Sequence, residues 1–303
     1  MKIISVIIPV LNEEDNIVII YKKIKSFFHN KQNYKFEIIF TDNNSKDKTA
    51  PILQEICSND ASVKCIRFKY NIGYDRSVLQ GYMHSTGDAA VALDCDLQDP
   101  TELIDKFLNY WEEGYDLIYG VRKKREEGKL FTLLRNVYYK LMNKFSFFRY
   151  PIGAGDFRLI DNSIIKKLKN QKEFFPYVRG LTYLLSNNAI GVEYDRLKRV
   201  KGKSKFNYLN AFKYALNAII EESFLIQKIL TTSIMAICIF YIFLTFIDLF
   251  FGVFNLKIYL IIIIALMLIN LSFNILNNEL ISRSYLKLKN REENIFEKKI
   301  NFV

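Results

Sequence analysis

Cysteine is scarce in this 303-residue chain, and its spacing excludes a disulfide framework. The four cysteines, Cys57, Cys65, Cys95 and Cys238, form no C-x-x-C pair and no metal-type spacing. Cys238 lies in an apolar run, so the set indicates reduced thiols in a cytosolic domain. The apolar part of the N-terminal segment is too short for a signal peptide and lacks a small-residue cleavage site, so we expect a strand there.

Histidine is rarer still, and one common nucleotide-binding motif is missing. The two histidines, His29 and His84, fall in predicted helices away from every motif described below. We therefore expect both to be surface or packing residues. No G-x-G-x-x-G sequence follows the first predicted strand, which argues against a dinucleotide-binding dehydrogenase.

Basic residues exceed acidic ones, 43 Lys and Arg against 32 Asp and Glu, for a net charge of +11. This excess favours anionic partners such as phosphates, nucleotides or acidic lipid headgroups. A biased composition, rich in Lys, Ile and Asn throughout the chain, would also explain much of this excess of basic residues. We expect no nucleic-acid partner.

The first 120 residues alternate short apolar runs with amphipathic segments. Continuous apolar strands that alternate with helices predict a mainly parallel sheet covered on both faces. Ligands of such sheets bind at the carboxyl ends of the strands. The strands are expected at residues 3–10, 36–41, 63–68, 89–93 and 116–119, and the helices at 14–28, 51–58, 76–85 and 101–111.

The chain changes character after residue 206. Residues 207–228 form an amphipathic pattern suited to a membrane surface, or to covering the domain's own core. Two apolar runs follow, at 229–254 and 258–276, each near the ~20 residues that span hydrocarbon. Two buried core helices are the alternative. Lys and Arg cluster outside the hairpin, which predicts that domain 1–206 and tail 277–303 lie in the cytosol, with 229–276 in the inner membrane.

Three acids follow the predicted strand at residues 89–93. Asp94, Asp96 and Asp99 stand within six residues and precede Pro100. Carboxylates crowded at a strand end repel one another unless a cation lies among them. Mg²⁺ held by one or two carboxylates and by substrate phosphates is a common solution, and Mn²⁺ has similar preferences.

The segments 5–14 and 94–100 resemble the family-2 glycosyltransferases of α/β GT-A fold, and more narrowly the polyprenyl-phosphate glycosyltransferases. The resemblance covers nearly the whole chain, including the two-helix anchor. Further similar stretches are 111–122, 155–159, 179–181, 196–205 and 278–291.

The resemblance implies a role for each matching residue around the donor. Asp96 and Gln98 would hold Mg²⁺ or Mn²⁺, with Asp94 turned toward the donor's sugar or ribose. The nucleoside would lie against loops after the first two strands. This nucleotide-sugar set is Pro9, Asn12, Glu13, Asp42, Asn43 and Asp94. Asn12 and Glu13 would also suit the start of a helix.

The resemblance places the acceptor among basic residues. Asp156 is the candidate acid there, and the alternative is an ion pair, with Arg158, that orders its loop. Phosphate recognition favours Arg forks and Lys point charges, although a solvated basic face is the alternative. The candidate phosphate-binding residues are Arg122, Arg196, Arg199, Ser204 and Lys205.

Two motifs depart from the family pattern, and the first concerns the donor nucleotide. Asp42-Asn43-Asn44-Ser45 replaces Asp-Asp-Gly-Ser, so one acid is lost. Tyr70 replaces the Arg that commonly precedes the Asn-x-Gly turn. Lys69 could substitute, though without the geometry of a guanidinium group.

The sequence thus predicts an inverting, metal-dependent transferase. It would move one sugar from a nucleotide-sugar, with a UDP-sugar favoured, to polyprenyl (undecaprenyl) phosphate at the cytosolic membrane face. A processive polysaccharide synthase is an alternative, but Trp111, the one tryptophan, stands in no Arg-x-x-Arg-Trp motif. A non-catalytic membrane scaffold would not need the clustered acids. The resemblance also suggests a homo-oligomer.

Overall fold

The structure is a computed structural model, and its described residues fall into two compact units. The first combines Met1–Tyr139, Tyr150–Asn207 and Glu292–Val303, and the second Lys140–Arg149 and Tyr208–Arg291. The described residues are 1–31, 33–123, 129–145, 151, 153–170, 177–197, 219, 225–251, 256–288 and 295–302.

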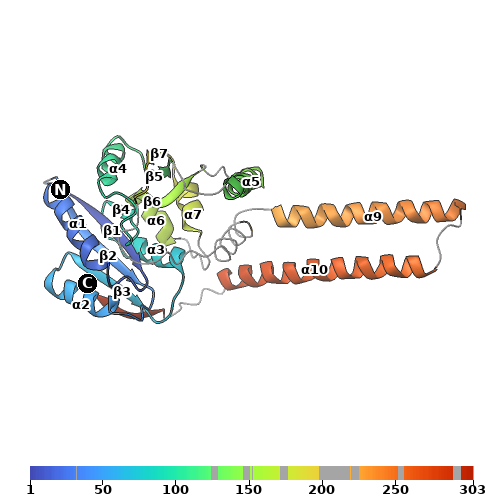
Figure 1. The fold of residues 1–303 in the computed structure, drawn as a ribbon, viewed down its shortest axis with the longest axis horizontal. Coiled ribbons are helices and arrows are strands. Elements are labelled where there is room, and N and C mark those ends of the chain that lie inside the picture. The colour runs from blue at the N-terminus through green and yellow to red at the C-terminus, as the bar shows by residue number, and fades with distance from the viewer. Residues whose placement is uncertain are drawn as a thin grey trace. The chain divides into compact units, whose positions relative to one another are not determined.

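The first unit is built on one eight-stranded sheet of order β7-β5-β6-β4-β1-β2-β3-β8 (Figure 1). All strands run in one direction except β6 and β8, which are antiparallel to their neighbours. The sheet is therefore mainly parallel, as predicted. The strands are β1 (Lys2–Val10), β2 (Tyr34–Asp42), β3 (Val63–Phe68), β4 (Ala89–Ala92), β5 (Leu117–Arg122), β6 (Ala154–Asp161), β7 (Ala189–Tyr194) and β8 (Phe296–Ile300).

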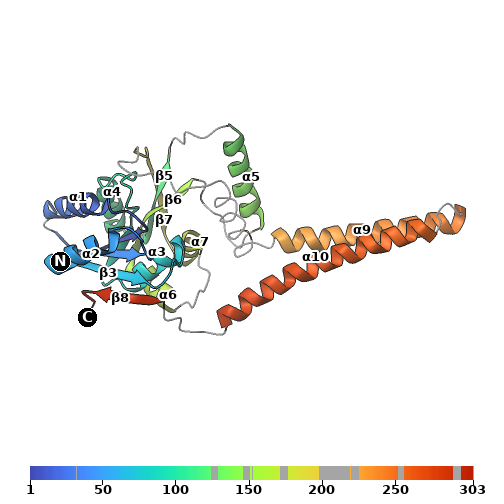
Figure 2. The same ribbon diagram turned by 60° about the horizontal axis from the view of Figure 1, so that its bottom comes forward.

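Helices cover both faces of this sheet (Figures 1 and 2). One core cluster contains Ile4, Val6 and Ile8 of β1 with residues of α1, α2 and α4, and the other contains Ile7 with residues of α3, α6 and α7. Alternate strand residues point to opposite faces, so an apolar strand requires both covers. The helices are α1 (Ile17–His29), α2 (Thr49–Asn59), α3 (Tyr74–Met83), α4 (Leu103–Glu112), α5 (Lys129–Phe145), α6 (Asn162–Asn170) and α7 (Val178–Leu185).

The strand register brings three loops to the same edge of the sheet. Val10, the last residue of β1, pairs with Asp42, the last residue of β2. Ala92, the last residue of β4, pairs with Ile7 on the other side of β1. Pro9 lies beyond the residues of β1 that pair with β4, at a place where its missing N–H breaks no pairing to that strand. The loops after these strands therefore converge.

Strand β8 follows the two long helices in the chain, yet it completes the sheet beside β3. The Asn301 side-chain nitrogen fastens it by donating to the carbonyl oxygens of Cys57 and Val63, both at 2.7 Å. The ring of Phe296 lies 6.0 Å from that of Phe68. The sequence analysis placed these residues in a tail without a strand, because a five-residue Phe-Glu-Lys-Lys-Ile run has little apolar pattern of its own.

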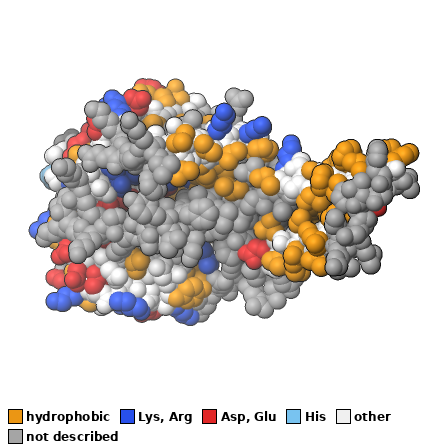
Figure 3. Space-filling view, turned by 45° about the vertical axis from the view of Figure 1, so that its right-hand side comes forward, with side chains coloured by type: hydrophobic (Ala, Val, Ile, Leu, Met, Phe, Trp, Pro, Cys, Tyr) orange, Lys and Arg blue, Asp and Glu red, His pale blue; other side chains and the backbone are white. Residues whose placement is uncertain are grey.

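The second unit contains α9 (Leu225–Phe251) and α10 (Leu256–Leu288), which run side by side in opposite directions (Figures 1 and 2). Thr231–Asp248 and Ile261–Glu279 are long and apolar enough to span a membrane, and neither window is buried. Hydrophobic side chains cover much of their described surface (Figure 3). Helix α10 continues twelve residues beyond 276, since it meets no Gly or Pro before residue 288. Most of the predicted amphipathic helix 207–228 lies outside the described residues.

Candidate active site

The acids after β4 are gathered by a tight turn. Leu97 has a left-handed backbone, with φ of 60°, which is unfavourable for a leucine. Its side chain is 3% exposed and packs in the core, which holds the turn in place. The Asp96 carboxylate accepts a 3.1 Å hydrogen bond from the Gln98 backbone nitrogen. Asp94, Asp96 and Asp99 are thereby brought together at the carboxyl edge of the sheet.

The crowding changes the acidity of these groups. Burial and the neighbouring Asp99, Asp96 and Asp156 raise the pKa of Asp94 to about 7, although the Tyr74 hydroxyl donates a 2.8 Å hydrogen bond to it. Burial likewise raises the pKa of Asp99, against the effect of Arg122. Both carboxyl groups therefore hold a proton more readily than an exposed aspartate does.

Two of the predicted phosphate-binding arginines lie against these acids. Arg196 nitrogens lie 3.7 Å from Asp94, 3.9 Å from Asp96 and 3.6 Å from Asp99. Arg122 Nη2 lies 4.0 Å from Asp99 Oδ1, which accepts a 2.5 Å hydrogen bond from the Tyr194 hydroxyl. The acid motif and the described part of the basic set thus form one site.

Backbone contacts hold Arg196 there. The Leu197 nitrogen donates to the Gln98 carbonyl oxygen at 2.8 Å, and Gln98 Nε2 donates to the Leu197 carbonyl oxygen at 3.3 Å. Residues 196 and 197 are therefore held against the Asp94–Gln98 turn by these two hydrogen bonds. Arg199, Ser204 and Lys205, the remaining predicted phosphate ligands, lie outside the described residues.

The acid cluster fits a divalent cation that shares its shell with a ligand. Carboxylate and amide oxygens are hard donors of the kind that Mg²⁺ and Mn²⁺ prefer. Asp99 Oδ2 is buried without a hydrogen-bond partner, which leaves an oxygen lone pair beside the other acids for a cation. Among the described residues, no three His, Cys, Asp or Glu side chains form a complete protein-only metal site.

Asp156 is held by Arg179 and not by Arg158, the partner that the sequence suggested. Arg179 donates to both Asp156 oxygens, at 3.1 and 2.7 Å. Arg158 instead donates to the Gly155 and Arg179 carbonyl oxygens and to the Thr182 hydroxyl. Burial alone would raise the pKa of Asp156, but Arg179, Arg158 and Arg122 together outweigh it and hold that pKa below its ordinary value. Asp156 is in strand β6 and not in a loop, and its ion pair with Arg179 joins β6 to α7.

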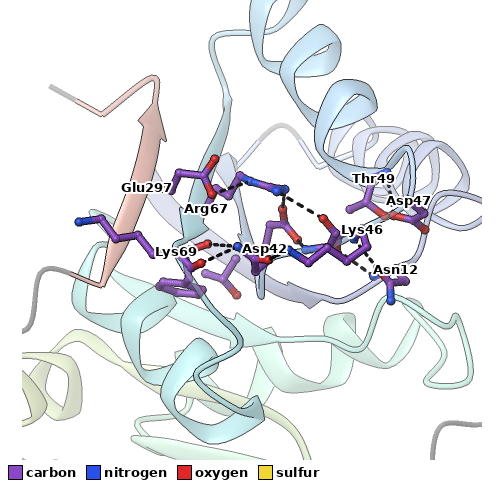
Figure 4. Close-up of polar contacts among 12 residues, drawn as sticks. Asn12, Asp42, Lys46, Asp47, Thr49, Arg67, Lys69 and Glu297 are labelled. Atoms are coloured by element: carbon purple, nitrogen blue, oxygen red, sulfur yellow. Dashed lines mark hydrogen bonds and ion pairs between the residues drawn. The ribbon is translucent and has the colours of Figure 1, made fainter.

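The loops after β1 and β2 are bonded to each other (Figure 4). The Asn12 nitrogen donates to Ser45 Oγ at 2.8 Å, and Asn12 Oδ1 accepts from the Lys46 nitrogen at 2.7 Å. The Glu13 carboxylate accepts from Asn16 Nδ2 at 2.7 Å, and its carbonyl oxygen accepts from the Asn16 and Ile17 nitrogens. Glu13 therefore lies in the turn that leads into α1, whose N-cap residue is Asn16.

Asp42 and Asn43 also serve these loops. Asp42 is fully buried and accepts from the Ser45 nitrogen at 3.0 Å and from Arg67 Nη1 at 2.5 Å. Asn43 donates to the Gly73 carbonyl oxygen at 3.4 Å and accepts from the Ile72 nitrogen at 3.3 Å. The side chains of Asp42 and Asn43 thus stabilise the loop after β2 and its contact with the Asn71-Ile72-Gly73 turn. The sequence did not indicate this structural role.

The sequence analysis missed Tyr74, Arg67 and Tyr194 as site residues. Each contacts a predicted site acid or arginine from another element. Tyr74 directly follows the Asn71-Ile72-Gly73 turn, which is the one signal that could have singled it out. Nothing in their local sequence marks Arg67 or Tyr194.

The raised pKa of Asp94 predicts a pH-dependent stability. Between about 4, the value in the unfolded chain, and about 7, the folded protein keeps a proton that the unfolded chain releases. Stability from this group is therefore lost as the pH rises through that window. We expect the unfolding temperature in EDTA to fall between about pH 5 and about pH 7.5, measured by differential scanning fluorimetry. An equal fall in Asp94→Asn would contradict this assignment.

Comparison with known proteins identifies the family of the domain. The mainly parallel sheet with the Asp94–Gln98 turn at its carboxyl edge is an α/β domain of the GT-A type. The model "Glycosyl transferase family 2" matches residues 5–169, and the chain belongs to that family, so it is a glycosyltransferase.

Two curated relatives match this chain over about 220 residues each. The "Uncharacterized glycosyltransferase YkcC" of Bacillus subtilis is 36% identical over 218 residues, 71% of this chain and 67% of that protein. The "Bactoprenol glucosyl transferase" of Shigella phage SfX is 35% identical over 217 residues, 71% of each. Among solved structures, Staphylococcus aureus TarS 1–349 with UDP-GlcNAc has a TM-score of 0.47 at 18% identity, covering 73% of this chain and 66% of that one.

Proposed function

We propose that this chain transfers one sugar, with inversion, from a nucleotide-sugar to polyprenyl (undecaprenyl) phosphate at the cytosolic face of the inner membrane. The observation that carries the proposal is the contact between the Asp94–Gln98 turn and the Arg196-Leu197 segment. A metal-type acid motif and an arginine suited to a phosphate meet in one site. The names of bactoprenol glucosyl transferases among the relatives support a lipid phosphate as acceptor.

The donor's diphosphate would lie at the acids, with a UDP-sugar favoured. A divalent cation, Mg²⁺ or Mn²⁺, held by Asp96 and Gln98 would neutralise the charge of the departing nucleoside diphosphate. The loops that contain Asn12 and Asp42 lie at the same edge of the sheet, so the nucleoside would be received there.

The acceptor needs little activation. A polyprenyl monophosphate is already largely ionised near neutral pH, since its second pKa is about 6 by analogy with phosphorylated side chains. Its oxygen can attack the anomeric carbon directly, and that attack on the face opposite the leaving group inverts the centre. Arg196 and Arg122 would orient the phosphate. Asp156 of β6, paired with Arg179 of α7, would keep this part of the acceptor site ordered and would not act as a base.

Two features support a membrane location. Helices α9 and α10 each contain an apolar window of membrane-spanning length. Helix α5 contains four Lys or Arg and no Asp or Glu, and it exposes Leu133, Leu134 and Val137. A basic helix with exposed apolar side chains is suited to an anionic lipid surface. Both features support the proposal that the acceptor is a lipid.

A donor panel tests the proposal. Detergent-purified protein is incubated with undecaprenyl phosphate and, in turn, UDP-glucose, UDP-galactose, UDP-GlcNAc and GDP-mannose, and products are weighed by mass spectrometry. We expect one donor to yield a lipid that carries a single sugar, and undecaprenol without phosphate to accept none. Lipids with several sugars would favour the processive alternative, and no transfer from any donor would overturn the proposal.

A further inference from the structure

The C-terminal strand β8 lies beside the loop that would receive the donor nucleoside. The Lys69 backbone nitrogen donates to the Ile295 carbonyl oxygen at 2.9 Å, just before β8 begins. Asn44 Nδ2, in the loop after β2, donates to the Phe68 and Lys69 carbonyl oxygens at 3.1 and 2.7 Å. The end of β3 thus has the tail strand on one side and the predicted nucleoside loop on the other.

One side chain joins these two neighbours. Arg67 of β3 donates to Asp42 Oδ2 at 2.5 Å, to the Ser45 carbonyl oxygen at 3.3 Å and to Glu297 Oε2 of β8 at 3.1 Å (Figure 4). The guanidinium group has five donors in a planar fork, so it can satisfy all three at once. Lysine could supply the charge but not this geometry.

The contacts of Arg67 continue into the loop after β1. Ser45, whose carbonyl oxygen Arg67 holds, accepts from the Asn12 nitrogen through its hydroxyl. Asp42 is 0% exposed, whereas the Glu297 side chain is 48% exposed. Asp42 therefore needs Arg67 for its own burial, while Glu297 can be changed without leaving a buried charge unpaired. Glu297 accepts the third of these hydrogen bonds from Arg67 and thereby sets the orientation of the guanidinium group.

We infer that Glu297 is a positioning residue of the donor-nucleotide site, acting through Arg67 on the loop 42–46. This inference rests on the proposed function only in requiring a nucleotide donor. It means that the segment following the membrane hairpin takes part in donor binding. An exposed ion pair that contributes only to stability is the competing explanation.

Nucleotide binding by the full-length, detergent-purified protein separates these explanations. UDP and GDP are titrated in the presence of Mg²⁺ by calorimetry, and unfolding temperatures are recorded in parallel. We expect Glu297→Ala to weaken binding of the preferred nucleotide about three- to tenfold, the net effect of one ordinary hydrogen bond. Glu297→Gln retains an oxygen acceptor and should lie near wild type. Lys298→Ala is the matched control, since the Lys298 side-chain nitrogen donates to Gln54 of α2 at 3.2 Å.

A second background tests whether Glu297 acts through Arg67. In Arg67→Lys, whose ammonium keeps the charge beside Asp42, adding Glu297→Ala should cause no further loss, because coupled residues give non-additive effects. Equal weakening in both backgrounds would overturn the inference. So would a Glu297→Ala affinity equal to that of Lys298→Ala, or a loss fully matched by a fall in unfolding temperature.

The outcomes also separate this inference from the proposed function. A wild-type protein that binds UDP or GDP but transfers no sugar to undecaprenyl phosphate overturns the proposed acceptor and leaves the role of Glu297 to be decided by its variants. A wild-type protein that binds neither nucleotide overturns both.

Discussion

Replacing Asp96 by Asn is expected to lower sugar transfer about a thousandfold while the protein stays folded. A metal ion contributes several kcal/mol to stabilising the charge of a leaving diphosphate, and each 1.36 kcal/mol is about tenfold in rate. Asn keeps the size of the side chain and an oxygen to accept from the Gln98 nitrogen. Because one crowded carboxylate is removed, we expect the unfolding temperature to stay level or rise. Initial rates at saturating donor and Mn²⁺ measure the effect.

The matched control is Asp105→Asn. Asp105 lies on α4 and pairs with Lys31 at 2.7 Å on the surface, so this change removes the same charge away from the site. Its rate should equal that of wild type. If Asp96→Asn kept more than about a tenth of the activity, the metal assignment would be wrong, since that loss corresponds to only about 1.4 kcal/mol.

Deleting residues 295–303 should lower the free energy of unfolding of the catalytic domain by about 3–5 kcal/mol. The deletion removes the buried Ile295 and the Phe296 ring from the core. It also leaves the edge of β3 open and removes the two 2.7 Å bonds from Asn301. An open edge invites pairing with other chains. Denaturant titration followed by tryptophan fluorescence of Trp111 measures the loss.

Asn301→Ala serves as the graded comparison for this deletion. It removes the 2.7 Å bonds to the carbonyl oxygens of Cys57 and Val63 and a longer one, 3.5 Å, to that of Asp60. We expect a loss of about 1–3 kcal/mol, the cost of leaving buried acceptors unsatisfied. A deletion variant as stable as Asn301→Ala would show that β8 adds nothing to the sheet beyond this one side chain.

The sequence was informative wherever neighbouring residues determine the structure. The continuous apolar run of β1 predicted a sheet covered on both faces, and the Asp94–Gln98 spacing predicted an acid cluster at the edge. The sequence did not predict contacts between side chains that lie far apart along the chain. Arg67 and Glu297 are 230 residues apart. Asp156 shares β6 with Arg158 but is bonded to Arg179 of α7. Which arginine meets which acid depends on the packing of α7 against β6, and local spacing does not encode that choice.

The position of β8 in the chain also has a consequence for the order of assembly. The two strands that form the β3–β8 pair are separated in synthesis by the site loops and both long helices. During that interval the outer edge of β3 has no strand partner, and a growing chain with an open edge is prone to wrong association. The sheet can be completed only once the hairpin has been made. A ribosome-bound chain should therefore hold an unfinished domain, and delay at the hairpin would prolong that vulnerable state.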